Sequence, residues 1–172
     1  MPISDADIYA RQAVEINSPI LQRIYQRYGT EILLSDGSLD RQRLGAIIFS
    51  QPTEKLWLEQ QIHPFVHRCL EESISQTTSA TIVLVVPLLI EAGMTDLVTE
   101  VWLVTCDPSQ QIARLTARDG LSLPAAQARI DSQMSIEQKL PFVDVVLKNI
   151  SSQASMLRQV DMALDYPLKK LF

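Results

Sequence analysis

Apolar residues of this chain gather in three short runs, at residues 81–86, 101–105 and 143–147. The runs are rich in β-branched side chains, which is typical of strands that are covered on both faces, as in a parallel sheet. A helical pattern follows each run, so we expect an α/β layer with right-handed crossovers. Residues 1–3 are predicted to form the end of a fourth strand.

The segment from residue 5 to about 75 has helical periodicity instead, interrupted by turn signals. This change of period predicts an all-helical insertion between two strands of the sheet. Asp40 is placed to cap one of its helices, and Pro52 to open the longest one. The expected helices lie near residues 5–16, 18–28, 40–49 and 53–75.

A pair of helices is predicted from 108 to 142, after the second of the three apolar runs. Asp107 before a proline starts the first helix, Gly120 ends it, and Ser122 starts the next. Open α/β sheets bind ligands at the carboxyl ends of their strands. Because this hairpin follows such an end, we interpret it as a candidate lid.

Composition limits the possible function classes. The chain has 172 residues, of which 47% are hydrophobic and 20% charged, and its net charge is -5. This balance predicts a globular protein and argues against a general nucleic-acid binder, which needs a basic face. The spacing of the two cysteines fits reduced, buried thiols. No apolar run or leader indicates membrane insertion or export, so the expected location is cytoplasmic, without a membrane partner.

Asp7 lies in the stretch D-x-D-x-x-A-R at residues 5–11, just after the first predicted strand. A carboxylate in that place can accept or orient a hydroxyl proton during phosphoryl transfer. The same residues also fit a capping box in which Ser4 is the N-cap and Asp7 satisfies a backbone donor. Spacing alone favours the cap. No glycine is followed by Lys-Ser or Lys-Thr, so the sequence holds no G-x-x-x-x-G-K-[ST] phosphate loop.

Basic residues recur at helical spacing in the predicted lid. Arg114 and Arg118 are four residues apart, as are Arg129 and Gln133. Each pair is expected to share one helix face, so that three guanidiniums and an amide can point into one cleft. Planar guanidinium groups bind phosphate oxygens well. The alternative is a solvated face of two amphipathic helices.

His63 and His67 have a spacing that can bind a metal on a helix. Pro64 is expected to disturb that helix, and no further ligand motif completes a site. Ordinary packing or a substrate contact is therefore favoured over zinc.

The exit from the run at 81–86 contains Pro87, which is expected to keep the backbone extended. Glu91 is then predicted to begin a short helix near Gly93. This exit lies where an acceptor substrate would be held in an α/β kinase.

Taken in order, these motifs resemble one family, dephospho-CoA kinase, over residues 3 to about 165. Each motif is weak by itself, and their order carries the resemblance. Besides the Asp7 stretch, the motifs are D-G-S-L-D-R at 36–41, I-H-P at 62–64, V-P-L-L-x-E at 86–91, R-L-x-x-R-D-G-L-S at 114–122, Arg129-Ile130 with Gln133, and D-V-V-L at 144–147 with Asn149.

The resemblance implies a P-loop kinase fold with a parallel sheet, helices on both faces, a helical CoA domain and a lid. It implies transfer of a phosphoryl group from ATP, with Mg²⁺, to the ribose 3′-hydroxyl of dephospho-CoA. The core would comprise 1–4, 77–107 and 142–172, the CoA domain 5–76 and the lid 108–141. The implied roles are catalysis for Asp7, acceptor binding for Arg11, His63, Pro64, Pro87, Leu88 and Leu89, phosphate binding for Arg114, Arg118, Arg129 and Gln133, and an adenine contact for Asn149.

The sequence departs from the family pattern in two ways that bear on function. The family's first strand and its phosphate loop are absent, which predicts an N-terminally truncated kinase. That strand would be central, between the runs at 81–86 and 101–105, so its loss predicts open strand edges and little or no activity. Ser151 also stands near Asn149 where a glycine is usual, which predicts a looser adenine loop.

Two alternatives remain from the sequence. One is a non-catalytic remnant that binds CoA or a nucleotide and acts through a partner. The other is a different nucleotide or nucleoside kinase, which the CoA-domain motifs disfavour. The sequence leaves the oligomeric state open.

Overall fold

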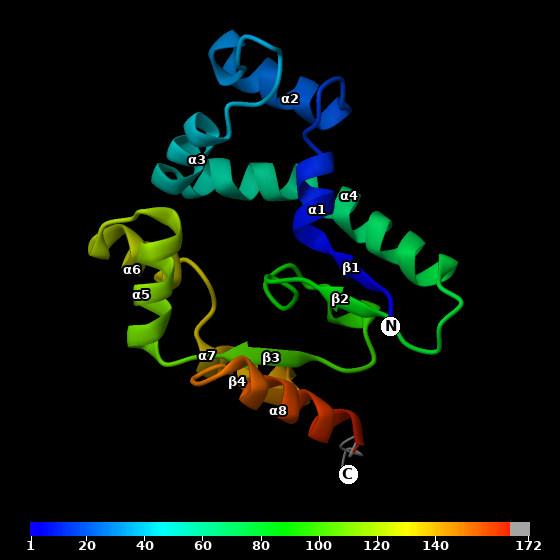
Figure 1. The fold of residues 1–172 in the computed structure, drawn as a ribbon. Coiled ribbons are helices and arrows are strands. Elements are labelled where there is room, and N and C mark those ends of the chain that lie inside the picture. Colours follow the sequence, from blue (N-terminus) through cyan, green and yellow to red (C-terminus); the bar gives the residue numbers. More distant parts are fainter. Residues whose placement is uncertain (166–172) are drawn as a thin grey trace. The chain divides into compact units, whose positions relative to one another are not determined.

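The computed structural model describes residues 1–165. The chain divides into two compact units, Met1–Pro87 and Leu88–Phe172, and each is described here by itself (Figure 1). The predicted core segment 142–172 extends past Asp165, so its last residues lie outside the described part. The division into core, CoA domain and lid stays a prediction.

The first unit combines a two-stranded parallel sheet with helices. Strand β1 pairs with β2 in the register Ile3 to Val83, and β1 leads directly into α1 (Figure 1). The long helix α4 packs against α1, α2 and α3. The elements are β1 (Ile3–Asp5), α1 (Ala6–Gln12), α2 (Pro19–Tyr28), η1 (Thr30–Ile32), α3 (Arg41–Ser50), α4 (Pro52–Gln76) and β2 (Val83–Val85).

Local sequence explains where the helices of this unit begin. The side chain of Ser18 accepts a hydrogen bond from the backbone N–H of Leu21, and Asp40 accepts one from Arg43, so α2 and α3 have conventional N-caps. Pro52 occupies the first turn of α4, as predicted. Helix α4 continues through Pro64, so the proline does not end the helix.

The core of the first unit lies between α2, α3 and α4. Ile24 and Ile32 are fully buried there, and Leu44 and Leu58 reach it from α3 and α4. Burial of such aliphatic side chains stabilises a fold by about 1.5–3 kcal/mol each. This core holds the helices that carry the candidate site described below.

A charged cluster on the surface of the first unit fixes α2 to α4. Arg27 donates two hydrogen bonds to the carboxylate of Glu54, at 2.6 and 2.8 Å, and Tyr28 donates a third at 2.5 Å. The Arg27 guanidinium also lies 4.6 Å from the ring centre of Trp57. The hydrogen bonds from Arg27 and Tyr28 lower the pKa of Glu54 to about 2. Burial and the bond to Glu54 raise the pKa of Tyr28 to about 12.

Ser4 is a buried polar residue in a strand position where an apolar side chain is usual. Its hydroxyl lies 2.9 Å from the hydroxyl of Tyr9, which lies 2.6 Å from that of Ser73. The three hydroxyls satisfy one another, so the strand tolerates the serine. They also join β1, α1 and α4.

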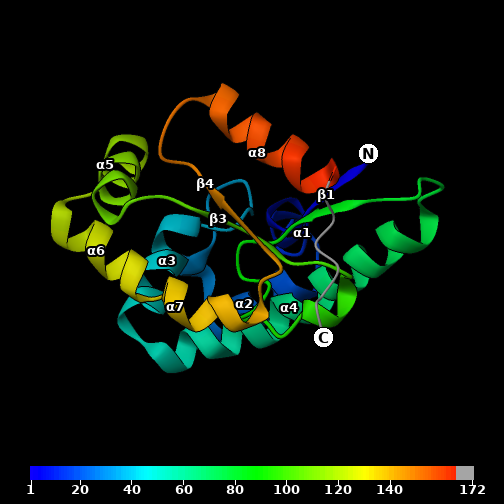
Figure 2. The ribbon, with the colours of Figure 1, turned by 90° about the horizontal axis from the view of Figure 1, so that it is seen from below.

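The second unit contains another parallel strand pair, β3 and β4, with helix α8 packed against β4 (Figures 1 and 2). The register pairs Trp102 with Val145. Helices α5 and α6, which come between β3 and β4 along the chain, form a hairpin. The elements are η2 (Thr95–Leu97), β3 (Trp102–Thr105), α5 (Pro108–Asp119), α6 (Leu123–Asp131), α7 (Ile136–Lys139), η3 (Leu140–Phe142), β4 (Val145–Lys148) and α8 (Gln153–Asp165).

The predicted signals for the α5–α6 hairpin are largely confirmed. Gly120 ends α5 in the left-handed region at φ 65°, and the Ser122 side chain caps α6. Asp107 occupies the N-cap position of α5, but its side chain makes no capping hydrogen bond. The predicted short helix at Glu91 is wrong, because residues 88–93 form successive turns.

Parallel strands accompanied by helices confirm the α/β class. The observed strands are shorter than the predicted ones. The first apolar run was predicted as a strand over residues 81–86, and β2 comprises Val83–Val85. Within the described residues, the four strands pair as two separate sheets of two strands. No helix in that part of the chain is long and apolar enough to cross a membrane.

Candidate active site

Asp7 lies in the first turn of α1, immediately after β1. The N-cap of this helix is Asp5, whose Oδ1 accepts a hydrogen bond of 2.9 Å from the backbone N–H of Asp7. The predicted capping box is therefore wrong, because β1 continues through Asp5 and Ser4 bonds to Tyr9 instead. The Asp7 side chain is exposed, and no hydrogen bond or ion pair within residues 1–165 engages its carboxylate. That carboxylate is free to meet a ligand.

The Asp7 cleft, as we call it, is a hollow of about 300 Å³ in the first unit. Charged side chains line it together with apolar ones from α1, α3 and α4, so it can hold a ligand with a polar and an apolar part. The charged lining residues are Asp7, Arg11 and Arg41. The others are Ala10, Val14, Leu39, Leu44, Gly45, Ile48, Leu58 and Ile62.

The predicted acceptor residues are only partly brought together. Arg11 lines the Asp7 cleft, whereas His63 and Pro64 do not, although the preceding residue Ile62 does. His67 pairs with Glu71 on the same helix at 3.2 Å. Within the described residues, no group of three or more His, Cys, Asp or Glu side chains is placed to hold a metal ion.

The exit of β2 contains the other predicted acceptor residues. Pro87 is the last residue of the first unit, and Leu88 and Leu89 continue the run of turns in which it lies. The Leu88 carbonyl accepts a hydrogen bond from Ala92, which closes one of these turns. Both leucines are half-buried.

Glu91, in the same turn segment, forms a contact that the sequence did not reveal. Its carboxylate pairs with Lys139 at 2.8 Å and accepts a hydrogen bond of 3.3 Å from the backbone N–H of Met134. Lys139 is 8% exposed, and a lysine buried to that degree needs such a partner. The contact fixes the segment between α6 and α7 to the residues that follow Leu89.

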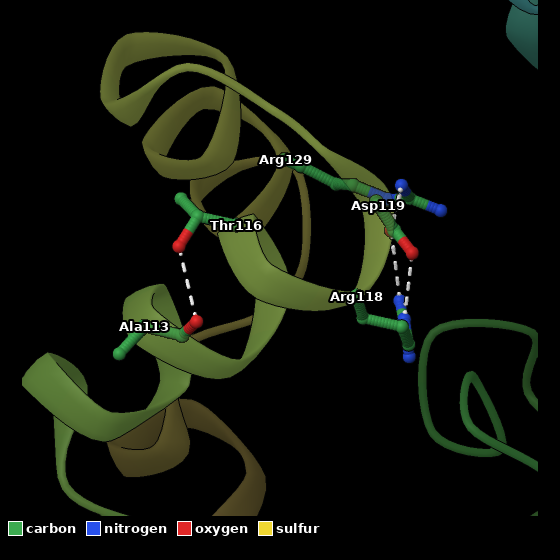
Figure 3. A network of polar contacts seen from close by, with 5 residues as sticks. All are labelled: Ala113, Thr116, Arg118, Asp119 and Arg129. Carbon is green, nitrogen blue, oxygen red and sulfur yellow. Dashed lines mark hydrogen bonds and ion pairs between the residues drawn. The ribbon is translucent and has the colours of Figure 1, made fainter.

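Two of the predicted phosphate-binding arginines meet at one carboxylate. Asp119 accepts hydrogen bonds from Arg118 at 2.7 and 3.0 Å and from Arg129 at 2.7 Å, as Figure 3 shows. The hydrogen bonds from Arg118 are the main cause of the lowered pKa of Asp119. The same bonds raise the pKa of Arg118. We call Arg118 and Arg129, which both bind Asp119, the arginine pair of the α5–α6 hairpin.

Arg114 and Gln133 do not belong to this arrangement. Arg114 is exposed and forms no ion pair with any described residue. Gln133 lies beyond the end of α6, because that helix stops at Asp131 and Ser132 is its C-cap. The prediction that Gln133 shares a helix face with Arg129 is therefore wrong.

Asn149 follows β4 directly. Its backbone N–H donates a hydrogen bond of 2.7 Å to the carbonyl of Thr105, at the end of β3. The next carbonyl, that of Ile150, accepts a bond of 3.3 Å from Gln110 of α5. The loop is thus held at the carboxyl ends of two parallel strands, where α/β folds bind ligands.

A family model and individual relatives both match this chain. The model of the family described as CoaE, dephospho-CoA kinase, matches residues 1–155. A dephospho-CoA kinase of Trichormus variabilis is 55% identical over 168 residues, which cover 98% of this chain and 86% of the relative. A Synechocystis dephospho-CoA kinase is 52% identical over 161 residues, 93% of this chain and 80% of its own.

This chain belongs to the dephospho-CoA kinase family. Solved structures agree. A crystal structure of a Thermus thermophilus protein matches with a TM-score of 0.80 at 30% identity, covering 98% of this chain and 85% of that one. A dephospho-CoA kinase from Campylobacter jejuni matches with a TM-score of 0.67 at 27% identity, covering 97% and 85%. The predicted enzyme class, a phosphotransferase, is thereby confirmed.

Family membership implies that a nucleotide serves as phosphoryl donor. Guanidinium groups such as those of Arg118 and Arg129 suit its phosphates. The described residues offer no cluster of carboxylates that fits a Mg²⁺ ion. In kinases that ion is held largely by substrate phosphates, so we assign it no protein ligands.

Sequence reasoning missed two charged residues of these sites. Arg41 belongs to the D-G-S-L-D-R motif, yet only the fold places it on the Asp7 cleft. Asp119 follows Arg118 directly, and that adjacency was the one signal for its role. The convergence of Arg129 on Asp119 depends on the turn at Gly120.

Proposed function

We propose that the Asp7 cleft binds dephospho-CoA and that the Asp7 carboxylate accepts or orients the proton of the ribose 3′-hydroxyl. The observation that carries this proposal is the free carboxylate on a mixed polar and apolar cleft. Because Asp5 already caps α1, Asp7 is not needed for the helix. A positioned carboxylate of this kind contributes about 10²–10⁴-fold to a rate by general base catalysis.

The remaining acceptor residues are assigned by family resemblance. Arg11 is proposed to bind the acceptor beside Asp7, and its place on the Asp7 cleft supports this role. His63 and Pro64 are proposed to contact the acceptor from α4. Pro87, Leu88 and Leu89 are proposed, by the same resemblance, to bind the acceptor.

The α5–α6 hairpin is proposed to be a lid that binds the phosphates of ATP through Arg118 and Arg129, with Arg114 and Gln133 as further contacts. The meeting of two guanidiniums supports the first pair. Asn149 is proposed to contact the adenine, supported by its place at the carboxyl ends of β3 and β4. Mg²⁺ is proposed to arrive with the nucleotide.

A polypeptide of these 172 residues alone is proposed to have little kinase activity, because its sequence contains no phosphate loop. Exposed valines support a need for further elements that cover the faces of these strand pairs. Val83 and Val85 of β2 are 38% and 42% exposed, and Val104 of β3 is 54% exposed. Valines of a parallel sheet are normally covered on both faces.

The cytoplasmic location stays a prediction.

The experiment measures ADP formation that depends on dephospho-CoA, in two polypeptides. One contains residues 1–172, and the other joins the same residues behind a strand and G-x-x-x-x-G-K-S loop from a dephospho-CoA kinase. We expect a rate far below the typical ~1–100 s⁻¹ of kinases for the first and a rate in that range for the second. Turnover at ordinary kinase rates by residues 1–172 alone would contradict the requirement for the loop.

A second candidate function is binding of CoA or a nucleotide without catalysis, favoured by the lack of a phosphate loop. In that case dephospho-CoA binds residues 1–172, but the loop-carrying polypeptide gains no activity. Calorimetry on both polypeptides distinguishes the two functions, because binding is expected in either case and turnover only in the first.

A further inference from the structure

The Asp7 cleft is positively charged in a chain that is acidic as a whole. One carboxylate, Asp7, and two guanidiniums, Arg11 and Arg41, line it, whereas the chain carries a net charge of -5. Neither guanidinium forms an ion pair with any residue in 1–165. The cleft therefore carries uncompensated positive charge, which favours an anionic ligand.

Other arginines of the same unit behave differently. Arg27 pairs with Glu54, and Arg43 pairs with Glu31. Arg43 is only two residues from Arg41 on α3, yet it is not among the residues that line the Asp7 cleft. On α3, the arginine without an ion pair to a described residue thus lines the cleft, and the paired arginine does not.

The fold fixes Arg41 at the rim of the cleft. Asp40 caps α3, so Arg41 is the first residue of the helix. Its Nη2 donates a hydrogen bond of 3.4 Å to the backbone carbonyl of Arg11, in the last turn of α1. This bond ties Arg41 to the helix that carries Asp7 and Arg11. Most of its N–H donors have no partner among the described residues, so they are available to a ligand.

We infer that Arg41, together with Arg11, binds the diphosphate group of the acceptor substrate and so selects a nucleotide over a nucleoside. This inference rests on the proposed function of the Asp7 cleft and extends it to substrate specificity. A guanidinium fork can hold phosphate oxygens by two parallel hydrogen bonds, which a lysine cannot reproduce. With the diphosphate held there, Asp7 is left for the hydroxyl, and the apolar lining of Leu44 and Ile48 is left for the uncharged part of the ligand.

The test measures the binding of dephospho-CoA to the full chain by calorimetry. The variants are R41Q, R41K and, as a matched control on the same helix, R43Q. Hydrogen bonds to charged groups are stronger than those between neutral groups, so R41Q is expected to weaken binding by about tenfold or more. R43Q is expected to stay within about twofold of the wild type, because an exposed ion pair contributes little. R41K keeps the charge and is expected to lie between them.

Two further measurements separate phosphate binding from a structural role. Inorganic pyrophosphate is expected to compete with dephospho-CoA in the wild type and to compete poorly in R41Q. The affinity of the wild type is expected to fall with added salt, and that of R41Q to fall less, because screening acts on the lost charge pair. If Arg41 only held α3 to α1, R41Q would keep both the competition by pyrophosphate and the salt dependence of the wild type.

Equal binding by R41Q, R43Q and the wild type would overturn the inference while leaving the proposed acceptor site intact. If R41Q fails to fold, equal binding by R41K and the wild type, without competition by pyrophosphate, overturns it equally. If the wild type does not bind dephospho-CoA, or binds it equally well after the half-buried Ile48 in the cleft lining is changed to asparagine (Ile48→Asn), the proposed function itself fails.

Discussion

The Asp7 cleft and the arginine pair of the α5–α6 hairpin differ in whether their charged side chains form ion pairs. In the cleft, Asp7, Arg11 and Arg41 form no ion pairs with described residues. In the hairpin, Arg118 and Arg129 are both engaged by Asp119 (Figure 3). An acceptor can therefore meet free charges in the cleft, whereas a phosphate group at the hairpin has to compete with a carboxylate that the protein supplies.

Local backbone geometry causes this difference. In the cleft, Asp5 takes over the capping of α1, which leaves Asp7 without a structural task. In the hairpin, Gly120 turns the chain at φ 65°, and the turn brings Asp119 within 2.7 Å of Arg129. With the roles proposed above, the cleft offers free charges to an acceptor, and the hairpin holds two guanidiniums together before a nucleotide binds.

The largest expected effect is the loss of activity when the free carboxylate of the cleft is removed. Asp7→Asn, in the polypeptide that carries the phosphate loop, is expected to lower kcat by about 10²–10⁴-fold, because the amide cannot accept the proton. Binding of dephospho-CoA is expected to change little. The coupled ADP assay and calorimetry measure these two quantities.

Asp5→Asn is the matched control for Asp7→Asn. Asparagine caps helices about as well as aspartate, so this variant keeps α1 and removes a neighbouring carboxylate. Its kcat is expected to stay near that of the wild type. A similar loss of kcat in both variants would show that negative charge near the cleft matters, and that Asp7 has no special role.

A smaller effect is expected at the hairpin, where the carboxylate is engaged. Asp119→Asn removes the charge that competes with phosphate and leaves the turn at Gly120 in place. We expect inorganic triphosphate to bind this variant about three- to tenfold more tightly, a range that fits the modest strength of exposed ion pairs. Asp131→Asn, at the end of α6, is the control and is expected to have no such effect. Weaker binding in Asp119→Asn would mean that Asp119 preorganises the arginines more than it competes with phosphate.

Much of the fold could be predicted because its signals are local. Asp40, Pro52, Gly120 and Ser122 each begin or end a helix by backbone chemistry that is visible in a few residues. The end of α6 could not be predicted, because neither glycine nor proline marks Ser132 as its C-cap. Gln133 was therefore placed on a helix face that ends before it.

The candidate site was harder to predict because its contacts are distant in the sequence. Spacing predicted a capping box with Ser4 as the N-cap, but β1 extends through Asp5, and Asp5 caps α1 instead. Arg41 reaches Arg11 across 30 residues, and no periodic pattern can show that contact. Order along the chain identified the family, whereas only the fold showed which charges stay free.

The smallest expected effect concerns the paired charges of the unit that contains the cleft. Glu54→Gln removes the charge that Arg27 and Tyr28 stabilise, and it keeps the shape of the side chain. The pKa of Glu54 is about 2 in the folded protein, below its ordinary value of 4.5. A lowered carboxyl pKa stabilises the fold above the unfolded-state value and loses that contribution as pH falls through the folded-state value.

The melting temperature of the wild type is therefore expected to exceed that of Glu54→Gln by several degrees near neutral pH. The gap should narrow as pH falls from about 4.5 toward about 2, over the interval set by the two pKa values of Glu54. Glu59→Gln is the control on the same helix, since Glu59 forms a longer pair, of 3.8 Å, with Lys55. A constant gap across this pH range would show that Glu54 acts through its hydrogen bonds alone. In that case the contrast between paired charges that hold helices and free charges that meet a ligand would lose its electrostatic basis in this unit.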